Sequence, residues 1–321
     1  SLLAAGSWLY IASNKGWPVS TTHSIVGAIG GFVVITKGID AVSWSKVGEI
    51  ASSWITSPLI AGILAFFIYL SAQKLIINAK NQVAAAIFYI PFYSFFVTGI
   101  IAQVIARKGL SHIGLSWSDD EILVFTTLMA LLAGGLTSLV LRLKKESISS
   151  KGGIEYAFGI LMIVTACAMA FAHGSNDVAN AIGPVAAIIS VVNSNDLSLT
   201  APINPAVLLL GGAGIVFGLA TLGYKVIKTV GEKITKLTPS LGFSAEMAAA
   251  STVVFASYLG FPISTTHTLI GGVIGVGLAN GAKNLDWSSV YRIFASWIIT
   301  IPVGAVLTIL FYVLLRVMFG V

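Results

Sequence analysis

The sequence predicts an all-α, polytopic membrane protein with inverted repeats, two re-entrant helical hairpins and a broken transmembrane helix. Three observations support this prediction. Of the 321 residues, 56% are hydrophobic and only 9% are charged, whereas a soluble domain carries about 25% charged residues. Several segments run for about 20 residues almost without charge, as a bilayer-spanning helix requires. One polar motif also occurs twice, each time inside apolar sequence.

Six segments are long and apolar enough to cross a bilayer as helices. They are residues 47–71, 83–106, 122–141, 154–172, 205–224 and 292–315. The net charge of +6 comes from basic residues in the loops between them, so it indicates membrane orientation and not a nucleic-acid partner. The single cysteine, Cys167, lies in an apolar run and excludes a disulfide framework. We therefore expect a multi-pass protein of the cell (plasma or inner) membrane.

The loop charges predict which ends face the cytoplasm. Loops 72–82, 142–153, 225–243 and 280–291 contain eleven Lys or Arg, whereas loops 37–46, 107–121 and 193–204 contain four. Because cytoplasmic loops are enriched in Lys and Arg, the first set is predicted to be cytoplasmic. Glu246, near the cytoplasmic start of one apolar arm, is then expected at the membrane–water interface.

The repeated motif reveals an internal duplication. "GWPVSTTHSIVGAIGG" begins at Gly16 and "GFPISTTHTLIGGVIG" at Gly260, and "ASSWITSP" at 51–58 matches "FASWIITIP" at 294–302. The loop charges give these two later segments opposite directions, so the copies are predicted to be inverted, as in many secondary transporters. We expect a truncated first repeat at 1–143 and a second repeat at 144–321. The first repeat has no counterpart of "GSNDVANA", so we also expect a longer protein, and no transport by a chain beginning at Ser1.

Three segments are expected to interrupt ordinary spanning helices. Residues 1–36 and 244–279 each return to their own side of the membrane, so each is predicted to form a re-entrant hairpin with the polar motif at its tip. Residues 154–193 must cross once, yet contain the Gly- and Asn-rich "AHGSNDVANAIGP". We therefore expect a helix broken near the midplane, which a membrane tolerates only where protein or a water-filled cavity covers it.

The hydroxyl runs at the hairpin tips are candidate anion ligands. They comprise Ser20, Thr21, Thr22, Ser264, Thr265 and Thr266. An ordinary helix N-cap explains one such run. Two opposed helix starts, however, each with free N–H groups and the positive end of a dipole, could surround a tetrahedral oxyanion. His23 and His267 could donate to that anion or pack against a neighbouring arm, and packing is the favoured interpretation.

The segment "HGSNDVANA" is a candidate cation site. It contains His173, Ser175, Asn176, Asp177 and Asn180. An ionisable residue inside a membrane span is functional by default, and carboxylate and amide oxygens suit a hard cation such as Na⁺. No Lys or Arg accompanies Asp177 or the hydroxyl runs. A cation at Asp177 would therefore remove its repulsion of the anion, so that the two ligands bind cooperatively.

These residues resemble the inorganic phosphate transporter (PiT) family. The resemblance rests on both Pro-x-Ser-Thr-Thr-His hairpins and on "GSNDVANA", with Ser175 in place of the more frequent Ala, and it covers essentially the whole chain. It implies a phosphate symporter, often a homodimer, driven by Na⁺ or H⁺ and without another cofactor. The six tip hydroxyls would bind phosphate with Asn176 and Asp177 beside them, and Na⁺ would lie near Ser175, Asn176, Asp177 and Asn180.

Several alternatives remain open at this point. The same fold could carry phosphate with H⁺, a metal–phosphate complex, or sulfate. A passive anion channel would need no cation site. An intramembrane hydrolase using Ser264, His267 and Asp177 is disfavoured, because a nucleophile needs a positioned base and an oxyanion hole and a duplicated serine run serves no catalysis. The sequence therefore favours a transporter and not an enzyme.

Overall fold

The computed structural model describes residues 1–106, 117–194, 204–261 and 263–320. Within these ranges the protein is built from helices, without a β-strand. The helices are α1 (Leu2–Asn14), α2 (Thr21–Lys37), α3 (Trp44–Ala72), α4 (Gln82–Val104), α5 (Asp119–Leu143), α6 (Lys145–Ser149), α7 (Gly153–Ser194), α8 (Pro205–Gly218), α9 (Tyr224–Lys228), α10 (Pro239–Tyr258), α11 (Thr265–Ala279) and α12 (Trp287–Phe319). The all-α prediction is confirmed.

Six helical segments of the described chain are long and apolar enough to span a membrane. They are Trp44–Ile77, Gln82–Gln103, Asp119–Leu143, Gly153–Val192, Pro205–Ile234 and Trp287–Phe319. Each contains one of the six segments predicted from the sequence, or nearly all of it. Polar residues set some of their starts: the Ser118 side chain accepts from the Glu121 backbone N–H while the Glu121 carboxylate accepts from the Ser118 N–H, a reciprocal capping box.

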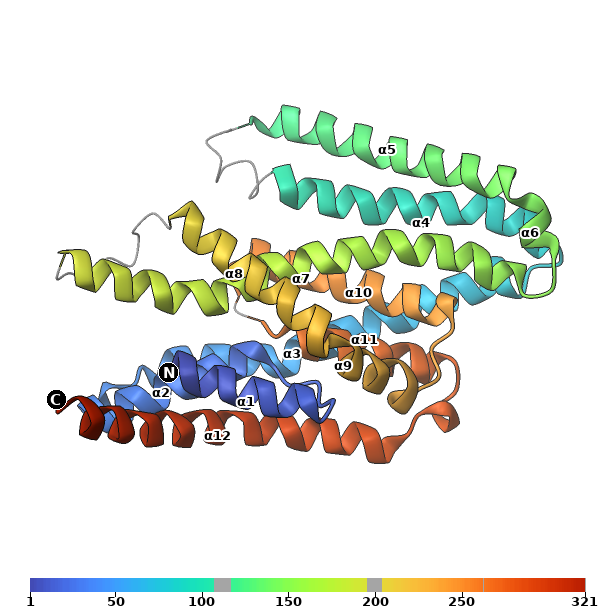
Figure 1. Ribbon diagram of the computed structural model, residues 1–321. Coiled ribbons are helices and arrows are strands. Elements are labelled where there is room, and N and C mark those ends of the chain that lie inside the picture. The colour runs from blue at the N-terminus through green and yellow to red at the C-terminus, as the bar shows by residue number, and fades with distance from the viewer. Residues whose placement is uncertain (107–116, 195–203, 262, 321) are drawn as a thin grey trace.

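Two helical hairpins lie at the centre of the molecule. In Figure 1, α1 and α2 form one hairpin and α10 and α11 form the other, and they point in opposite directions so that their tips overlap. Gly16 and Gly260 occupy equivalent tip positions with φ of 69° and 75°, a left-handed conformation that glycine adopts without steric cost. Helices α4 and α5 pack together at one edge of the molecule, whereas α12 lies at the opposite edge (Figure 1).

The hairpins pack across the two sequence copies. Helix α2, in the first copy, packs against α12 of the second, and α11 of the second copy packs against α3 of the first. Glycines allow this contact, because a Cβ at Gly31 would lie 2.5 Å from Ala305 Cα and a Cβ at Gly275 would lie 2.1 Å from the Gly62 carbonyl oxygen. Such small residues let helix backbones approach closely. Since Gly31 and Gly275 are 244 residues apart, the packing follows the internal duplication.

The predicted break in the third segment is wrong. Helix α7 continues from Gly153 to Ser194 through the whole Gly- and Asn-rich motif and through Pro184. The polar side chains Asp177 and Asn180 find partners on the hairpins from within the intact helix, so the motif does not require a break in the backbone. Proline inside transmembrane helices is also tolerated where neighbouring groups satisfy the freed backbone.

Candidate functional site

Each hairpin tip leads into a helix capped by the first hydroxyl of its motif. Ser20 Oγ accepts from the His23 backbone N–H, and Ser264 Oγ accepts from the His267 N–H, both at 3.2 Å. The N-cap interpretation is thus confirmed for both serines. An accepting hydroxyl keeps its own hydrogen, so capping does not prevent either serine from donating to a ligand.

The two tips contact each other directly. Thr22 Oγ1 donates to the carbonyl oxygen of Ile263 on the opposite tip at 3.4 Å. Reciprocally, Thr266 Oγ1 donates to the carbonyl oxygen of Val19 at 3.4 Å. Because Thr22 and Thr266 are equivalent residues of the duplicated motif, the contact has approximate two-fold symmetry. The hydroxyl runs predicted to face each other therefore do so.

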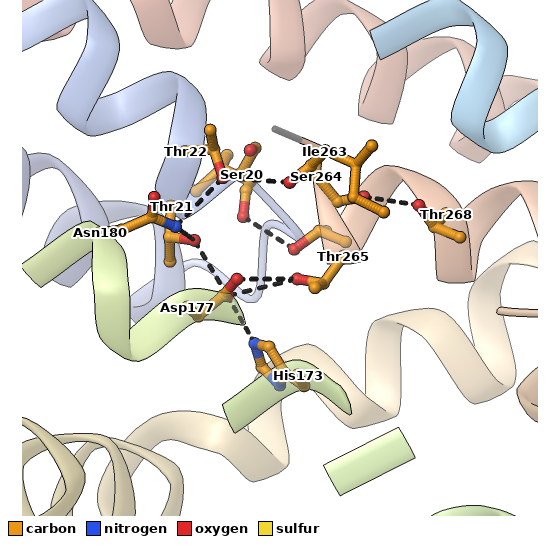
Figure 2. Close-up of polar contacts among 12 residues, drawn as sticks. Ser20, Thr21, Thr22, His173, Asp177, Asn180, Ile263, Ser264, Thr265 and Thr268 are labelled. Carbon is orange, nitrogen blue, oxygen red and sulfur yellow. Dashed lines mark hydrogen bonds and ion pairs between the residues drawn. The ribbon is translucent and has the colours of Figure 1, made fainter. Parts of the chain in front are cut away.

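The carboxylate of Asp177 joins both tips to α7 (Figure 2). Thr21 Oγ1, from the first hairpin, donates to Asp177 Oδ2 at 3.0 Å. Thr265 Oγ1, from the second, lies 3.3 Å from Oδ1 and 3.2 Å from Oδ2. Asp177 is only 6% exposed, so the carboxylate and these hydroxyls form a largely dehydrated polar centre. In this centre each hydrogen bond is electrostatically stronger than it would be in water.

Two further side chains of α7 complete the cluster. Asn180 Nδ2 lies 3.1 Å from Thr22 Oγ1 and 3.4 Å from Thr21 Oγ1, and donates to both. His173 Nε2 is 2.6 Å from Asp177 Oδ2. Residues 173, 177 and 180 are spaced four and three apart, so they lie on one face of α7. Figure 2 shows this face directed toward the two hairpin tips.

His23 and His267 meet edge to face in an aromatic cluster at the first turns of α2 and α11. Their ring centroids are 4.3 Å apart. The His23 ring lies 3.8 Å from that of Trp54, and the His267 ring stacks 3.5 Å from that of Trp297. Both histidines are buried. The packing role favoured from the sequence therefore matches the geometry, which links the two hairpins through aromatic contacts.

One predicted ligand does not join the cluster. Asn176 is partly exposed and makes no hydrogen bond to a hairpin residue that the structure describes. The side chain of Ser175 lies outside the described part of the structure. The other predicted hydroxyls, Asp177 and Asn180 lie at or beside the contact between the tips.

A second polar pair was not predicted. The carboxylate of Glu246, a half-buried residue expected at the membrane–water interface, accepts a 2.7 Å hydrogen bond from Thr165 Oγ1, between α10 and α7. A carboxylate hydrogen-bonded between two helices is more costly to disturb than an interfacial one. The one sequence signal was an isolated acidic residue within the apolar segment 239–258.

The site has the composition of a ligand-binding centre without fixed positive charge. Two helix N-termini, α2 and α11, point toward it and favour anions. Apart from the His173 ring nitrogen beside Asp177, the donors are hydroxyls and one amide; the only carboxylate is Asp177, and no Lys or Arg side chain in the described chain contacts the cluster. Within the same ranges no group of three or more His, Cys, Asp and Glu side chains could hold a metal ion. A cation at Asp177 would therefore be coordinated mainly by hydroxyl and amide oxygens, as suits a hard ion.

Two opposed hairpins enclose a polar centre within a bundle of apolar helices. This arrangement is that of a multi-pass membrane transporter and not of an enzyme. The particular family follows from comparison with known proteins. The PHO4 phosphate transporter family model matches residues 1–308, so this chain belongs to that family. Its function is accordingly phosphate transport.

Individual relatives agree with this assignment. A Haemophilus influenzae protein named "Putative phosphate permease" is 45% identical over 325 residues, covering 100% of this chain and 77% of the relative. "Inorganic phosphate transporter 2-1, chloroplastic" of Arabidopsis thaliana is 40% identical over 343 residues, covering 97% of this chain and 57% of the relative. Among solved structures, "The sodium-dependent phosphate transporter" aligns with a TM-score of 0.89 at 36% identity, covering 98% of this chain and 78% of that one.

Proposed function

We propose that the protein is a Na⁺-coupled phosphate symporter, which holds phosphate between the two hairpin tips and Na⁺ at Asp177. The observation that carries the proposal is the hydrogen bonding of one carboxylate to hydroxyls from both hairpins: Thr21 and Thr265 both donate to Asp177. The name of the structural relative, a sodium-dependent phosphate transporter, supports the same ion.

Competition for hydroxyl hydrogens supplies a coupling mechanism. A threonine hydroxyl has a single hydrogen to donate, so Thr21 and Thr265 cannot fully serve Asp177 and a phosphate oxygen together. Na⁺ bound to the Asp177 carboxylate would take over the stabilisation of that charge and release the hydroxyls to phosphate. Conversely, phosphate that engages the hydroxyls would free carboxylate oxygens to bind Na⁺.

Charge repulsion between Asp177 and phosphate also couples the binding of phosphate to the binding of Na⁺. Two unit negative charges about 4 Å apart repel by about 4 kcal/mol at the effective dielectric typical of protein sites. Since about 1.4 kcal/mol corresponds to a tenfold change in affinity, neutralising Asp177 could strengthen phosphate binding by up to roughly a thousandfold. Linkage then requires that phosphate strengthen Na⁺ binding by the same factor.

Binding without Lys or Arg also allows release. Hydroxyl donors and helix dipoles hold an anion less tightly than bidentate arginine does. Once Na⁺ leaves, Asp177 would again repel phosphate and reclaim the hydroxyls. We propose that the two inverted halves, 1–143 and 144–321, rock about the tips to expose the site alternately, as in other inverted-repeat transporters.

The test is uptake of radiolabelled phosphate by full-length protein in proteoliposomes, with and without an inward Na⁺ gradient and with excess sulfate as competitor. Na⁺-dependent uptake that ignores sulfate is expected. Asp177→Asn should abolish the Na⁺ dependence, and Thr265→Val should weaken phosphate binding about tenfold or more, because charged hydrogen bonds contribute roughly 1.5–3 kcal/mol each.

Thr36→Val is the matched control, because the Thr36 hydroxyl donates only to carbonyls of its own helix and its loss should leave transport unchanged. Uptake that is independent of Na⁺ in the unmodified protein would exclude Na⁺ coupling. Uptake that sulfate suppresses would assign the site to oxyanions more broadly.

One observation favours H⁺ as the alternative coupling ion. His173 and Asp177 are joined at 2.6 Å, and a histidine–carboxylate pair can carry a proton. In that case an inward pH gradient would drive uptake without Na⁺, and His173→Gln would abolish that response. If the His173→Gln variant keeps full Na⁺-driven uptake, His173 serves only to orient Asp177.

A further inference from the structure

A basic pocket lies at the first hairpin tip, and none of the residues that line it belongs to the Asp177 cluster. It has a volume of about 100 Å³, several times the roughly 10–15 Å³ that one water needs. Its walls come from the tip itself, from the segment Thr229–Ile234 and from the first turns of α12. The loop charges place this side of the protein toward the cytoplasm.

Three cations line this pocket. Lys15 belongs to the hairpin tip, Lys233 to the segment before α10 and Arg292 to α12. The Lys15 ammonium lies 4.8 Å from the centre of the Trp17 ring, a cation–π contact that favours a position near the tip. Positive charge from three separate elements therefore converges on one cavity.

Two hydroxyls help to position the cations. Ser289 and Thr229 are both buried and line the same pocket. Arg292 Nη2 donates to Ser289 Oγ at 3.0 Å, which holds the guanidinium beside the cavity. Because Ser289 Oγ donates to Asp286 and Thr229 Oγ1 to the Lys225 carbonyl oxygen, the donors left for a ligand are those of the cations, and Arg and Lys bind phosphate oxygens through charge-assisted hydrogen bonds.

The local acidic groups do not cancel this charge. No Asp or Glu side chain is among the residues that line the pocket. Asp286 lies nearby, and it accepts from Ser289 Oγ at 2.7 Å and from the Ser288 N–H at 3.0 Å. The hydrogen bond from the Ser289 side chain lowers the pKa of Asp286, so this carboxylate stays ionised and offsets part of the Arg292 charge. Lys15 and Lys233 remain without an acidic partner among the lining residues.

We propose that this pocket is a second anion site that binds a phosphate group, separate from the centre between the hairpin tips. Two sources carry that group: inorganic phosphate passing to or from the centre, and the headgroup of an anionic phospholipid. The pocket shares the tip segment with Ser20, since Lys15, Gly16, Trp17 and Pro18 all line it. A phosphate group bound there would contact the element that caps the central site. Assignment of inorganic phosphate as the occupant rests on the proposed function; the phosphate-group site itself does not.

The test uses full-length protein in detergent and two probes, radiolabelled inorganic phosphate in equilibrium dialysis and dioctanoyl phosphatidylglycerol in titration calorimetry. The pocket variant is Lys233→Gln with Arg292→Gln. The matched control is Lys228→Gln with Lys236→Gln, which removes two exposed lysines of the same region that do not line the pocket. A central-site variant, Thr265→Val, is measured in parallel.

At least one probe is expected to bind the pocket variant tenfold or more weakly than the control. Loss of phosphate affinity identifies the transported anion as occupant, and loss of phosphatidylglycerol affinity identifies a lipid headgroup; either result supports the site. Equal affinity of both probes for the pocket and control variants would overturn the proposal. Thr265→Val should leave pocket binding intact, so failure of the central site and failure of this site give different results.

Discussion

The close approach of α2 to α12 makes a sharp prediction for two adjacent glycines. A Cβ at Gly31 would lie 2.5 Å from Ala305 Cα and 2.6 Å from the Ala305 carbonyl oxygen, whereas a Cβ at Gly30 would meet no atom within 4 Å. Favourable carbon contacts require about 3.5–4.0 Å. In Gly31→Ala the two helices must therefore separate by about 1 Å, because the atoms in the way belong to backbone and cannot rotate aside.

The magnitude follows from two opposing terms. Overpacking costs typically about 1–3 kcal/mol, whereas Gly→Ala inside a helix gains up to about 1 kcal/mol. With a central overpacking cost of about 2 kcal/mol, we expect Gly31→Ala to lower the free energy of unfolding by about 1 kcal/mol, whereas Gly30→Ala raises it by up to about 1 kcal/mol. The difference of about 2 kcal/mol can be measured by denaturant unfolding of the purified protein, followed by tryptophan fluorescence. Equal stability of the two variants would refute the packing described for α2 and α12.

Three further substitutions test individual contacts. Ser264→Ala should lower the free energy of unfolding by about 1 kcal/mol through loss of the α11 cap, as measured by the same unfolding assay. The control Ser251→Ala removes only a hydrogen bond to its own helix and should change the free energy of unfolding little. Equal effects of the two substitutions would contradict the capping role. Trp297→Phe should cost about 1–3 kcal/mol, because it leaves the Pro18 carbonyl at the first tip without its 3.0 Å donor; unchanged unfolding would show that this bond does not stabilise the tip. Thr165→Val should destabilise by about 1–3 kcal/mol by removing the donor to Glu246, and Thr165→Ser should restore stability; failure of serine to do so would assign the loss to packing.

The helices and hairpin tips could be predicted because each rests on a local pattern. Apolar length alone located the six spanning segments, and the repeated Pro-x-Ser-Thr-Thr-His motif identified both helix starts. The pairing of Thr21 and Thr265 on Asp177 was only partly predictable. The opposed hairpins bring their tips together, but which hydroxyl reaches the carboxylate depends on how α7 crosses between them.

Three features could not be predicted from the sequence. The continuity of α7 depends on tertiary partners for Asp177 and Asn180, which a single segment does not reveal. The Glu246–Thr165 pair joins residues 81 positions apart, and neither residue belongs to a motif. Likewise, Lys15, Lys233 and Arg292 are separated by long stretches of sequence, and only the fold brings them around one pocket.

Because each hairpin packs on a helix of the other sequence copy, the order of synthesis affects how the protein folds. The first hairpin leaves the ribosome long before α12, because its packing partner on α12 lies about 270 residues later, as the contact of Gly27 with Ile301 shows. At about 5–20 residues per second, roughly 14–55 s pass before that surface exists. During this time the hydroxyl-bearing tip has no α12 beside it, and Asp177, which lies 156 residues after Thr21, is made only after roughly half of the interval. A nascent hairpin of this kind would need shelter, from the insertion machinery or at the membrane surface, until α12 has been made.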